Sequence, residues 1–267
     1  MDEREAVGRR YGEHLTDRDL LALAGDRADQ VPALRRHPAL VLDLLDRPPV
    51  ADAVLAADRD EPGRFRYVSP FLVFAAAVHR AGNALVGRTH VPDRTAPRSR
   101  LPVFDGPVLA AFAAAPAHRF FLTELLASYA RLASGVTWRR GDRGWERQRW
   151  DELDLPRLAA LLESLPAAEQ PGVWRRIGDC ALFLAGVFPE YAERTLGGGA
   201  AAARLRRVTG GGPAGEGPVG ELLEQLAGRA YGRAGSSVPP GVVEAPHSAR
   251  RMLTIVADRY LYPPLGC

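Results

Sequence analysis

Two arginines and an aspartate, Arg175, Arg176 and Asp179, stand directly before a strongly apolar run at 180–188. Residues three and four positions apart lie on one face of a helix, so either arginine can reach the carboxylate. A carboxylate buried alone would cost several kcal/mol, and it therefore needs a partner of opposite charge. The chemical interpretation of Asp179 is a general base or a ligand. Because intrahelical ion pairs are common, we predict a structural pair instead.

His79, His118 and Glu124 form a second group of candidates, because they lie on apolar segments that are expected to be central helices. Together with Asp179 they could line a buried carboxylate–histidine site, the arrangement that helical bundles use for acid–base chemistry or for metals. None of the six histidines takes part in HExxH or another recognised ligand spacing, so no metal site is assigned. The alternative is that each residue is a hydrogen-bonded polar group where helices meet.

The segment 138–150 is rich in arginine and tryptophan. Guanidinium groups neutralise phosphates and indole rings stack on bases, so nucleic acid or another polyanion is a candidate ligand. The alternative is a solvated hairpin whose tryptophans anchor it to the helical body, with arginines stacked on them. The candidate anion-binding residues are Arg139, Arg140, Arg143, Arg147, Arg149 and Trp145.

The composition excludes several kinds of chemistry. The chain is arginine-rich and contains no lysine, which excludes pyridoxal phosphate bound covalently to the chain and a P-loop with its phosphate-binding lysine. Cys180 and Cys267 are too few to hold zinc or an iron–sulfur cluster through cysteines alone. The motifs of serine hydrolases, dinucleotide-binding folds and EF-hands are absent. The identity of any cofactor is left open.

Hydrophobic periodicity predicts a mainly α-helical fold, an irregular multi-helix domain with one inserted β-hairpin. The central helices are expected at 70–88, 117–133 and 170–188, and the polar, proline-bearing segment 88–103 is expected to be a loop. The predicted core residues are Phe71, Phe74, Phe121, Leu125, Ile177, Phe183 and Leu184.

The inserted hairpin is predicted at 136–150, where alternating residue types flank the turn-forming run Gly141-Asp142-Arg143-Gly144. We expect a main helical domain at 1–196 that contains this hairpin. A flexible connection rich in glycine and alanine is expected at 197–220. Helices at 221–267 are expected to pack back on the main domain.

The longest strongly apolar runs have nine residues, whereas a membrane-spanning helix needs about twenty. The first residues are charged and precede no apolar stretch, so we expect a cytoplasmic protein that does not enter the membrane.

In the absence of a catalytic motif, the favoured function is a non-enzymatic helical interaction or regulatory protein, with a protein partner or a homo-oligomer. One alternative is an enzyme with a buried carboxylate–histidine site, with or without a metal. The other is binding of nucleic acid or another polyanion through the arginine-rich hairpin and loops.

Overall fold

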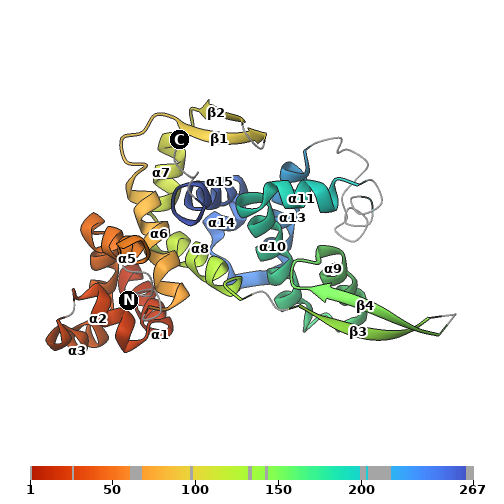
Figure 1. The fold of residues 1–267 in the computed structure, drawn as a ribbon, viewed down its shortest axis with the longest axis horizontal. Helices are drawn as coiled ribbons and strands as arrows, with labels where there is room; N and C mark the ends of the chain where they lie inside the picture. The colour runs from red at the N-terminus through yellow and green to blue at the C-terminus, as the bar shows by residue number, and fades with distance from the viewer. Residues whose placement is uncertain are drawn as a thin grey trace. The chain divides into compact units, whose positions relative to one another are not determined.

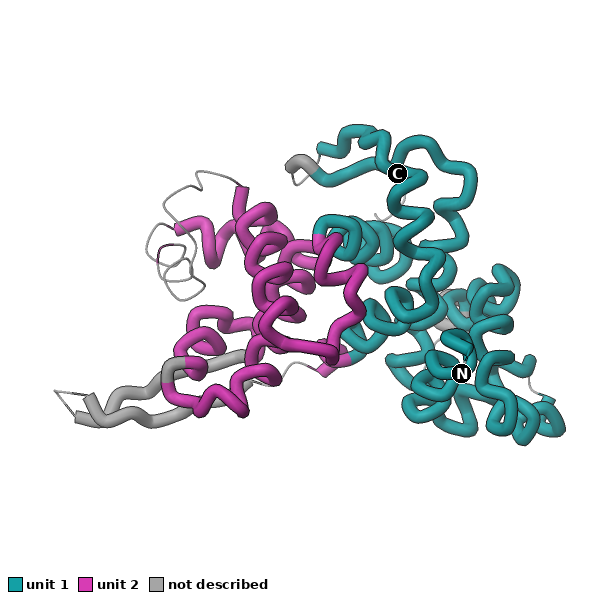
Figure 2. Tube along the Cα trace, turned by 180° about the vertical axis from the view of Figure 1, so that it is seen from behind, with its two compact units in different colours: residues 1–127, 247–267 teal, residues 128–246 magenta. Residues whose placement is uncertain are grey.

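The computed structural model describes residues 2–25, 27–60, 68–96, 99–131, 134–141, 144–198, 203 and 218–262. The chain forms two compact units (Figure 2). The first unit contains residues 1–127 and 247–267, and the second contains residues 128–246. The expected main domain, 1–196, spans the boundary between these units, and its standing as a single domain stays a prediction.

The first unit consists of helices and one small hairpin (Figure 1). Its elements are α1 (Glu3–His14), α2 (Asp17–Leu23), η1 (Ala28–Gln30), α3 (Val31–Arg36), α4 (Ala39–Leu45), α5 (Pro48–Asp60), α6 (Pro70–Asn83), β1 (Val91–Ala96), β2 (Ser99–Val103), α7 (Gly106–Ala114), α8 (Pro116–Ser128), α15 (Pro246–Val256) and the π-helical turn η4 (Ala257–Leu261).

Hydroxyl side chains set the start of two of these helices. Thr16 and Asp19 form a capping box at α2, in which each side chain bonds the other residue's backbone N–H. Ser69 caps α6, and Pro70 follows at the first helical position, which needs no backbone donor. Asp19 also accepts a hydrogen bond of 2.7 Å from the backbone N–H of Ser69, so the two caps are joined.

The second unit contains the larger hairpin and the longest helix. Its elements are β3 (Ser134–Gly141), β4 (Gly144–Asp151), α9 (Leu155–Ser164), α10 (Gln170–Val187), α11 (Pro189–Leu196), α13 (Val219–Ala234), η3 (Gly235–Ser237) and α14 (Pro240–Glu244). Helix α10 packs along α13 and against α9, and every residue from Ile177 to Val187 is buried.

The mainly α-helical fold and the inserted hairpin are confirmed. Strands β3 and β4 pair in antiparallel fashion over the predicted segment, with Trp138 opposite Arg147. Six of the seven predicted core residues are buried, and Phe74 is the exception, because its side chain is partly exposed.

The prediction of a loop at 88–103 is wrong, because this segment contains the antiparallel pair β1–β2. The prolines that indicated a loop, Pro92 and Pro102, stand directly opposite each other. Antiparallel strands alternate between hydrogen-bonded and non-hydrogen-bonded pairs, and a non-hydrogen-bonded pair requires neither proline to donate. The two prolines are therefore compatible with the strand pair.

Among the described residues, no helix combines the length and the apolar character that crossing a bilayer requires.

The predicted burial of two core residues, Leu125 and Leu184, can be tested by creating cavities. Leu125 and Leu184 are almost completely buried, so Leu125→Ala and Leu184→Ala should each lower the free energy of unfolding by about 2–5 kcal/mol in urea denaturation. Leu161, which is 43% exposed, is the control, and its replacement by alanine should cost less than about 0.5 kcal/mol. Equal, small losses at all three positions would contradict the core assignment.

Candidate functional site

Asp179 lies inside the second unit, in an ion pair with Arg175. Arg175 Nε lies 2.9 Å from both carboxylate oxygens, and the Tyr231 hydroxyl donates to Asp179 Oδ1 at 3.0 Å. Burial raises the pKa of Asp179 above its ordinary value, and the charge and hydrogen bond of Arg175 oppose that shift. Arg176 points to other partners, Glu152 and Ser128.

Gly178 allows Tyr231 to reach Asp179. A Cβ atom at position 178 would lie 2.4 Å from Tyr231 Cε1, so a larger residue would displace the ring. Helices α10 and α13 are therefore in close contact at this point. The buried Tyr231 hydroxyl donates its hydrogen bond to the Asp179 carboxylate. These contacts join the two helices and leave Asp179 buried, as a structural role requires.

His79 belongs to a buried polar network in the first unit. Its Nδ1 lies 2.8 Å from Asp46 Oδ1, and its Nε2 lies 3.1 Å from the Tyr11 hydroxyl. Because a carboxylate can only accept, Nδ1 carries the hydrogen, and Nε2 accepts from Tyr11. Arg119 also donates to Asp46. The network joins α1, α6 and α8 to the residue that ends α4.

The electrostatics of this network favour neutral His79 and neutral Tyr11. Burial lowers the pKa of His79 and raises that of Tyr11. Burial also raises the pKa of Asp46, but His79, Arg119 and Arg4 outweigh it and hold that pKa below its usual range. The order carboxylate–imidazole–hydroxyl resembles a catalytic relay, but His79 and Tyr11 are almost completely inaccessible to solvent.

Glu124 and His118 do not join the His79 network. Glu124 lies near α1, 3.8 Å from Arg10 and 4.0 Å from His14. His118 Nδ1 donates to the backbone carbonyl of Phe112 at 2.8 Å, and its ring stacks on that of Phe112. Within the first unit, His79, His118 and Glu124 therefore have separate partners, and the described residues contain no group of three histidine, cysteine, aspartate or glutamate side chains suited to a metal.

The candidate anion-binding residues are described only in part. Arg143 lies outside the described residues, as do the side chains of the other five candidates. Their backbone positions are given by the pairing of β3 with β4, in which Arg140 is opposite Trp145 and Arg139 is opposite Glu146. The prediction that these residues bind an anion remains a prediction.

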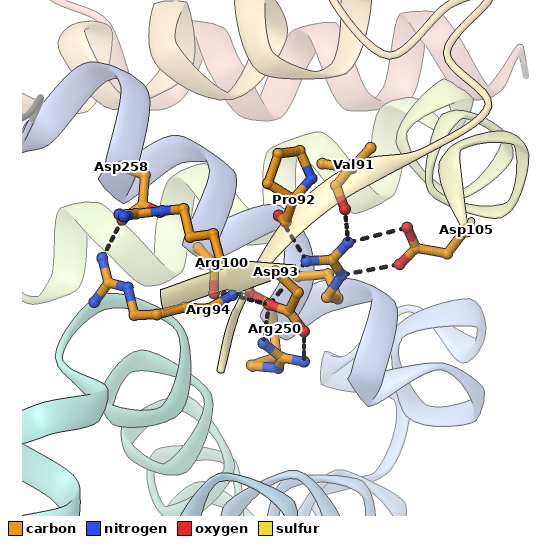
Figure 3. A network of polar contacts seen from close by, with 10 residues as sticks. Val91, Pro92, Asp93, Arg94, Arg100, Asp105, Arg250 and Asp258 are labelled. Atoms are coloured by element: carbon orange, nitrogen blue, oxygen red, sulfur yellow. Dashed lines mark hydrogen bonds and ion pairs between the residues drawn. The ribbon is translucent and has the colours of Figure 1, made fainter. Parts of the chain in front are cut away.

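A second polar network, which sequence reasoning missed, surrounds α15 (Figure 3). The guanidinium group of Arg251 is fully buried and forms a bidentate pair with Asp105 at 2.8 and 3.0 Å. Arg250 forms a bidentate pair with Asp93, and Asp258 accepts from Arg94 and Arg100. Burial raises the pKa of Asp93, but Arg250 and Arg251 outweigh it and lower that pKa below its usual range.

Side chains of α15 and α8 bind the two ends of α7. At its N-terminus, the cap residue Asp105 is bound by Arg251, and Gly106 packs so closely that a Cβ atom would lie 2.2 Å from the carbonyl oxygen of Arg88. At its C-terminus, the carbonyls of Phe112 and Ala113 accept from His118 and Arg119. Basic side chains are favourable at this end of a helix.

The outer face of α7 is exposed and uncharged. The helix sequence GPVLAAFAA contains no polar side chain, yet four of its residues face solvent. Phe104, directly before the helix cap, is 79% exposed and Val108 is 62% exposed. Val86, in the turn after α6, is 77% exposed. The α7 face, as this surface is called below, comprises Val86, Phe104, Pro107, Val108, Ala111 and Ala114.

Comparison with known proteins adds no assignment: no family model matches the chain, and no curated protein or solved structure matches it significantly.

The pKa of His79 leads to a prediction about stability. The unfolded chain binds a proton at this histidine near pH 6.5, whereas buried His79 resists protonation, so its contribution to stability should fall as the pH drops from about 7 to 5. His79→Gln should reduce the pH dependence of the unfolding free energy, measured by urea denaturation. The exposed His37→Gln is the control and should retain the wild-type dependence, and equal profiles for both variants would disprove the assignment.

The Asp179 pair leads to a second prediction. Asp179→Asn removes the charge that Arg175 faces, and Tyr231→Phe removes the donor to the same carboxylate. Each should lower the free energy of unfolding by about 1–3 kcal/mol, because buried partners remain unsatisfied. Glu152→Gln breaks the more exposed pair with Arg176 and should cost less than about 1 kcal/mol. A larger loss of unfolding free energy in Glu152→Gln than in Asp179→Asn would refute the structural role of Asp179.

Proposed function

We propose that this chain is a non-enzymatic helical interaction protein that associates with a second copy of itself through the α7 face. The observation that supports the proposal is the exposure of a helix without polar side chains. Helices that are apolar all round are normally buried, and exposed apolar surfaces on folded proteins mark places where another protein binds.

The α7 face belongs to a continuous part of the first unit. Gly82 of α6 lies against Ala113, and Arg88 lies against Gly106, so the chain from 82 to 88 runs antiparallel to α7. Val86 stands between these two contact points in the sequence, and both Val86 and Val108 of α7 are exposed. The exposed apolar residues therefore come from two segments that pack on each other.

The anchoring of α7 suits a binding surface. Arg251 fixes the cap before the helix, while His118 and Arg119 bond its last carbonyls. A surface built on a helix that is held at both ends loses little conformational freedom when it binds, so more of the burial energy contributes to affinity.

The absence of charge on α7 favours a second copy as the partner. In a symmetric dimer the same patch meets itself, so any charge near the axis would face a like charge. The α7 sequence contains no ionisable residue and avoids this repulsion. Ala111 and Ala114 are small, which permits two helices to approach closely, while Phe104 and Val108 supply apolar area.

The polar candidates fit a structural role within this proposal. Both oxygens of Asp179 are bonded by Arg175, and both ring nitrogens of His79 lie within hydrogen-bonding distance of side chains. In the described part of the chain these groups join helices, and none of them supports an enzymatic function over the interaction proposed here.

The proposal is tested by sedimentation equilibrium of the full chain over a range of concentrations. Wild type should show a reversible monomer–dimer equilibrium. Ala111→Glu should be monomeric at the same concentrations, because each dimer would bury two unpaired carboxylates that face each other.

The matched control is Leu161→Glu, which adds the same charge at an exposed apolar position on α9. It should dimerise like wild type, and circular dichroism should show that both variants remain folded. A monomeric wild type, or equal dimerisation by Ala111→Glu and wild type, would refute the proposal.

A further inference from the structure

The two faces of the β3–β4 hairpin differ in charge. Residues that are directly opposite in an antiparallel pair share a face, and successive residues of a strand alternate between faces. The pairing therefore assigns positions 134, 136, 138 and 140 to one face with their partners 151, 149, 147 and 145. Positions 135, 137 and 139 belong to the other face with 150, 148 and 146.

The six positions of the first set nearest the turn, called the Trp–Arg face below, carry two tryptophans, three arginines and one valine. Its members are Val136, Trp138, Arg140, Trp145, Arg147 and Arg149. Each tryptophan position is opposite an arginine position, and the acidic residue on the same side of the pair, Asp151, lies beyond Val136 and Arg149, opposite Ser134. On the other face the positions of Arg139 and Glu146 are opposite each other, so that the positive charge has a counter-charge.

Solvent reaches the base of the Trp–Arg face at Val136. It is the one position of this face whose side chain is described, and it is 41% exposed although it is apolar. Val136 lies at the base of the hairpin, and the turn at its opposite end joins Gly141 to Gly144.

We propose that the Trp–Arg face binds single-stranded nucleic acid, a function separate from association through α7. Three arginine positions supply charge for backbone phosphates. Two tryptophan positions supply aromatic rings on which unpaired bases can stack, an interaction that tolerates any base sequence. Trp138 and Trp145 occupy diagonal positions of the pair, which are roughly 7–8 Å apart in an antiparallel ladder, so two bases of one strand can stack at once.

The single-stranded form is favoured over a duplex because the duplex hides its bases. Arginine alone would serve either form, since both carry phosphates. The interleaved tryptophans add affinity where base faces are accessible, which is in single strands. A polyanion without bases, such as heparin, would gain nothing from the tryptophan positions.

The test uses fluorescence anisotropy of a labelled oligothymidine of about 16 nucleotides with the full-length chain. Trp145→Ala should weaken binding roughly tenfold or more, because base stacking on an aromatic ring is lost. Trp150→Ala removes a tryptophan from the other face, and it should change the affinity by less than about twofold.

Salt dependence tests the arginines. Contact with three phosphates gives a slope of log affinity against log salt of about −2 for a single strand, and Arg147→Ala should flatten this slope by about 0.7. Arg139→Ala changes the net charge equally but lies at the other face, and it should leave the slope unchanged. These charge-matched variants separate a defined contact from general electrostatic attraction.

The proposal predicts binding of oligothymidine at physiological salt, together with weaker binding of duplex DNA and heparin. Absence of binding to oligothymidine would overturn it. So would equal effects of Trp145→Ala and Trp150→Ala, or of Arg147→Ala and Arg139→Ala. Equal affinity for duplex or heparin, unaffected by Trp145→Ala, would assign the surface to charge alone and would also overturn it.

Discussion

The first unit depends on the burial of one guanidinium group. Arg251 is fully buried, and a charge in that position would be strongly unfavourable without partners. It lies 2.8 Å from Asp93, forms a bidentate pair with Asp105, and donates to the carbonyls of Val91 and Pro92. The helix that carries Arg251 follows the whole second unit in sequence, so the first unit is complete only when that helix returns.

The need of buried Arg251 for acidic partners also fixes the position of α7. Arg251 holds the residue that caps α7, and the neighbouring pair of Arg250 and Asp93 fixes β1 to the same helix. At the other end of α7, Arg119 joins the carbonyl of Ala113 to Asp46, the partner of His79. Buried polar contacts thus keep an apolar helix in position while its outer face remains open to solvent. The proposed self-association uses this combination of a fixed backbone and an uncovered surface.

Local features of the sequence were sufficient to predict part of this structure. The pair Arg175–Asp179 follows from helical spacing, and the cap at Ser69 with Pro70 marks the start of α6. The partners of His79 could not be predicted, because Asp46 and Tyr11 are distant in sequence and lie on different elements. The sequence does not distinguish Arg251 from the other arginines, because its partner Asp105 is distant in the chain.

Two features of the sequence become informative only beside the structure. Residues 106–114 contain no polar side chain, which marks α7 as a helix that either is buried or binds a partner. In residues 138–150 the alternation of residue types predicts a hairpin, but its two faces become distinct only when the pairing of β3 with β4 is known. A shift of register by one residue would change which residues share a face. Phe74 was misassigned because helical spacing alone does not show where neighbouring helices end.

The central claim is that buried Arg251 holds α7 in place, and hydrogen exchange of the full chain tests it most directly. Arg251→Met should lower the protection of backbone amides in α7 and β1 by tenfold or more, because local opening becomes easier by at least about 1.4 kcal/mol, while protection in α1 and α4 persists. Arg250→Met, on the same helix but without a bond to the α7 cap, should affect α7 much less. Unchanged protection of α7 in Arg251→Met, or an equal loss in both variants, would contradict the account.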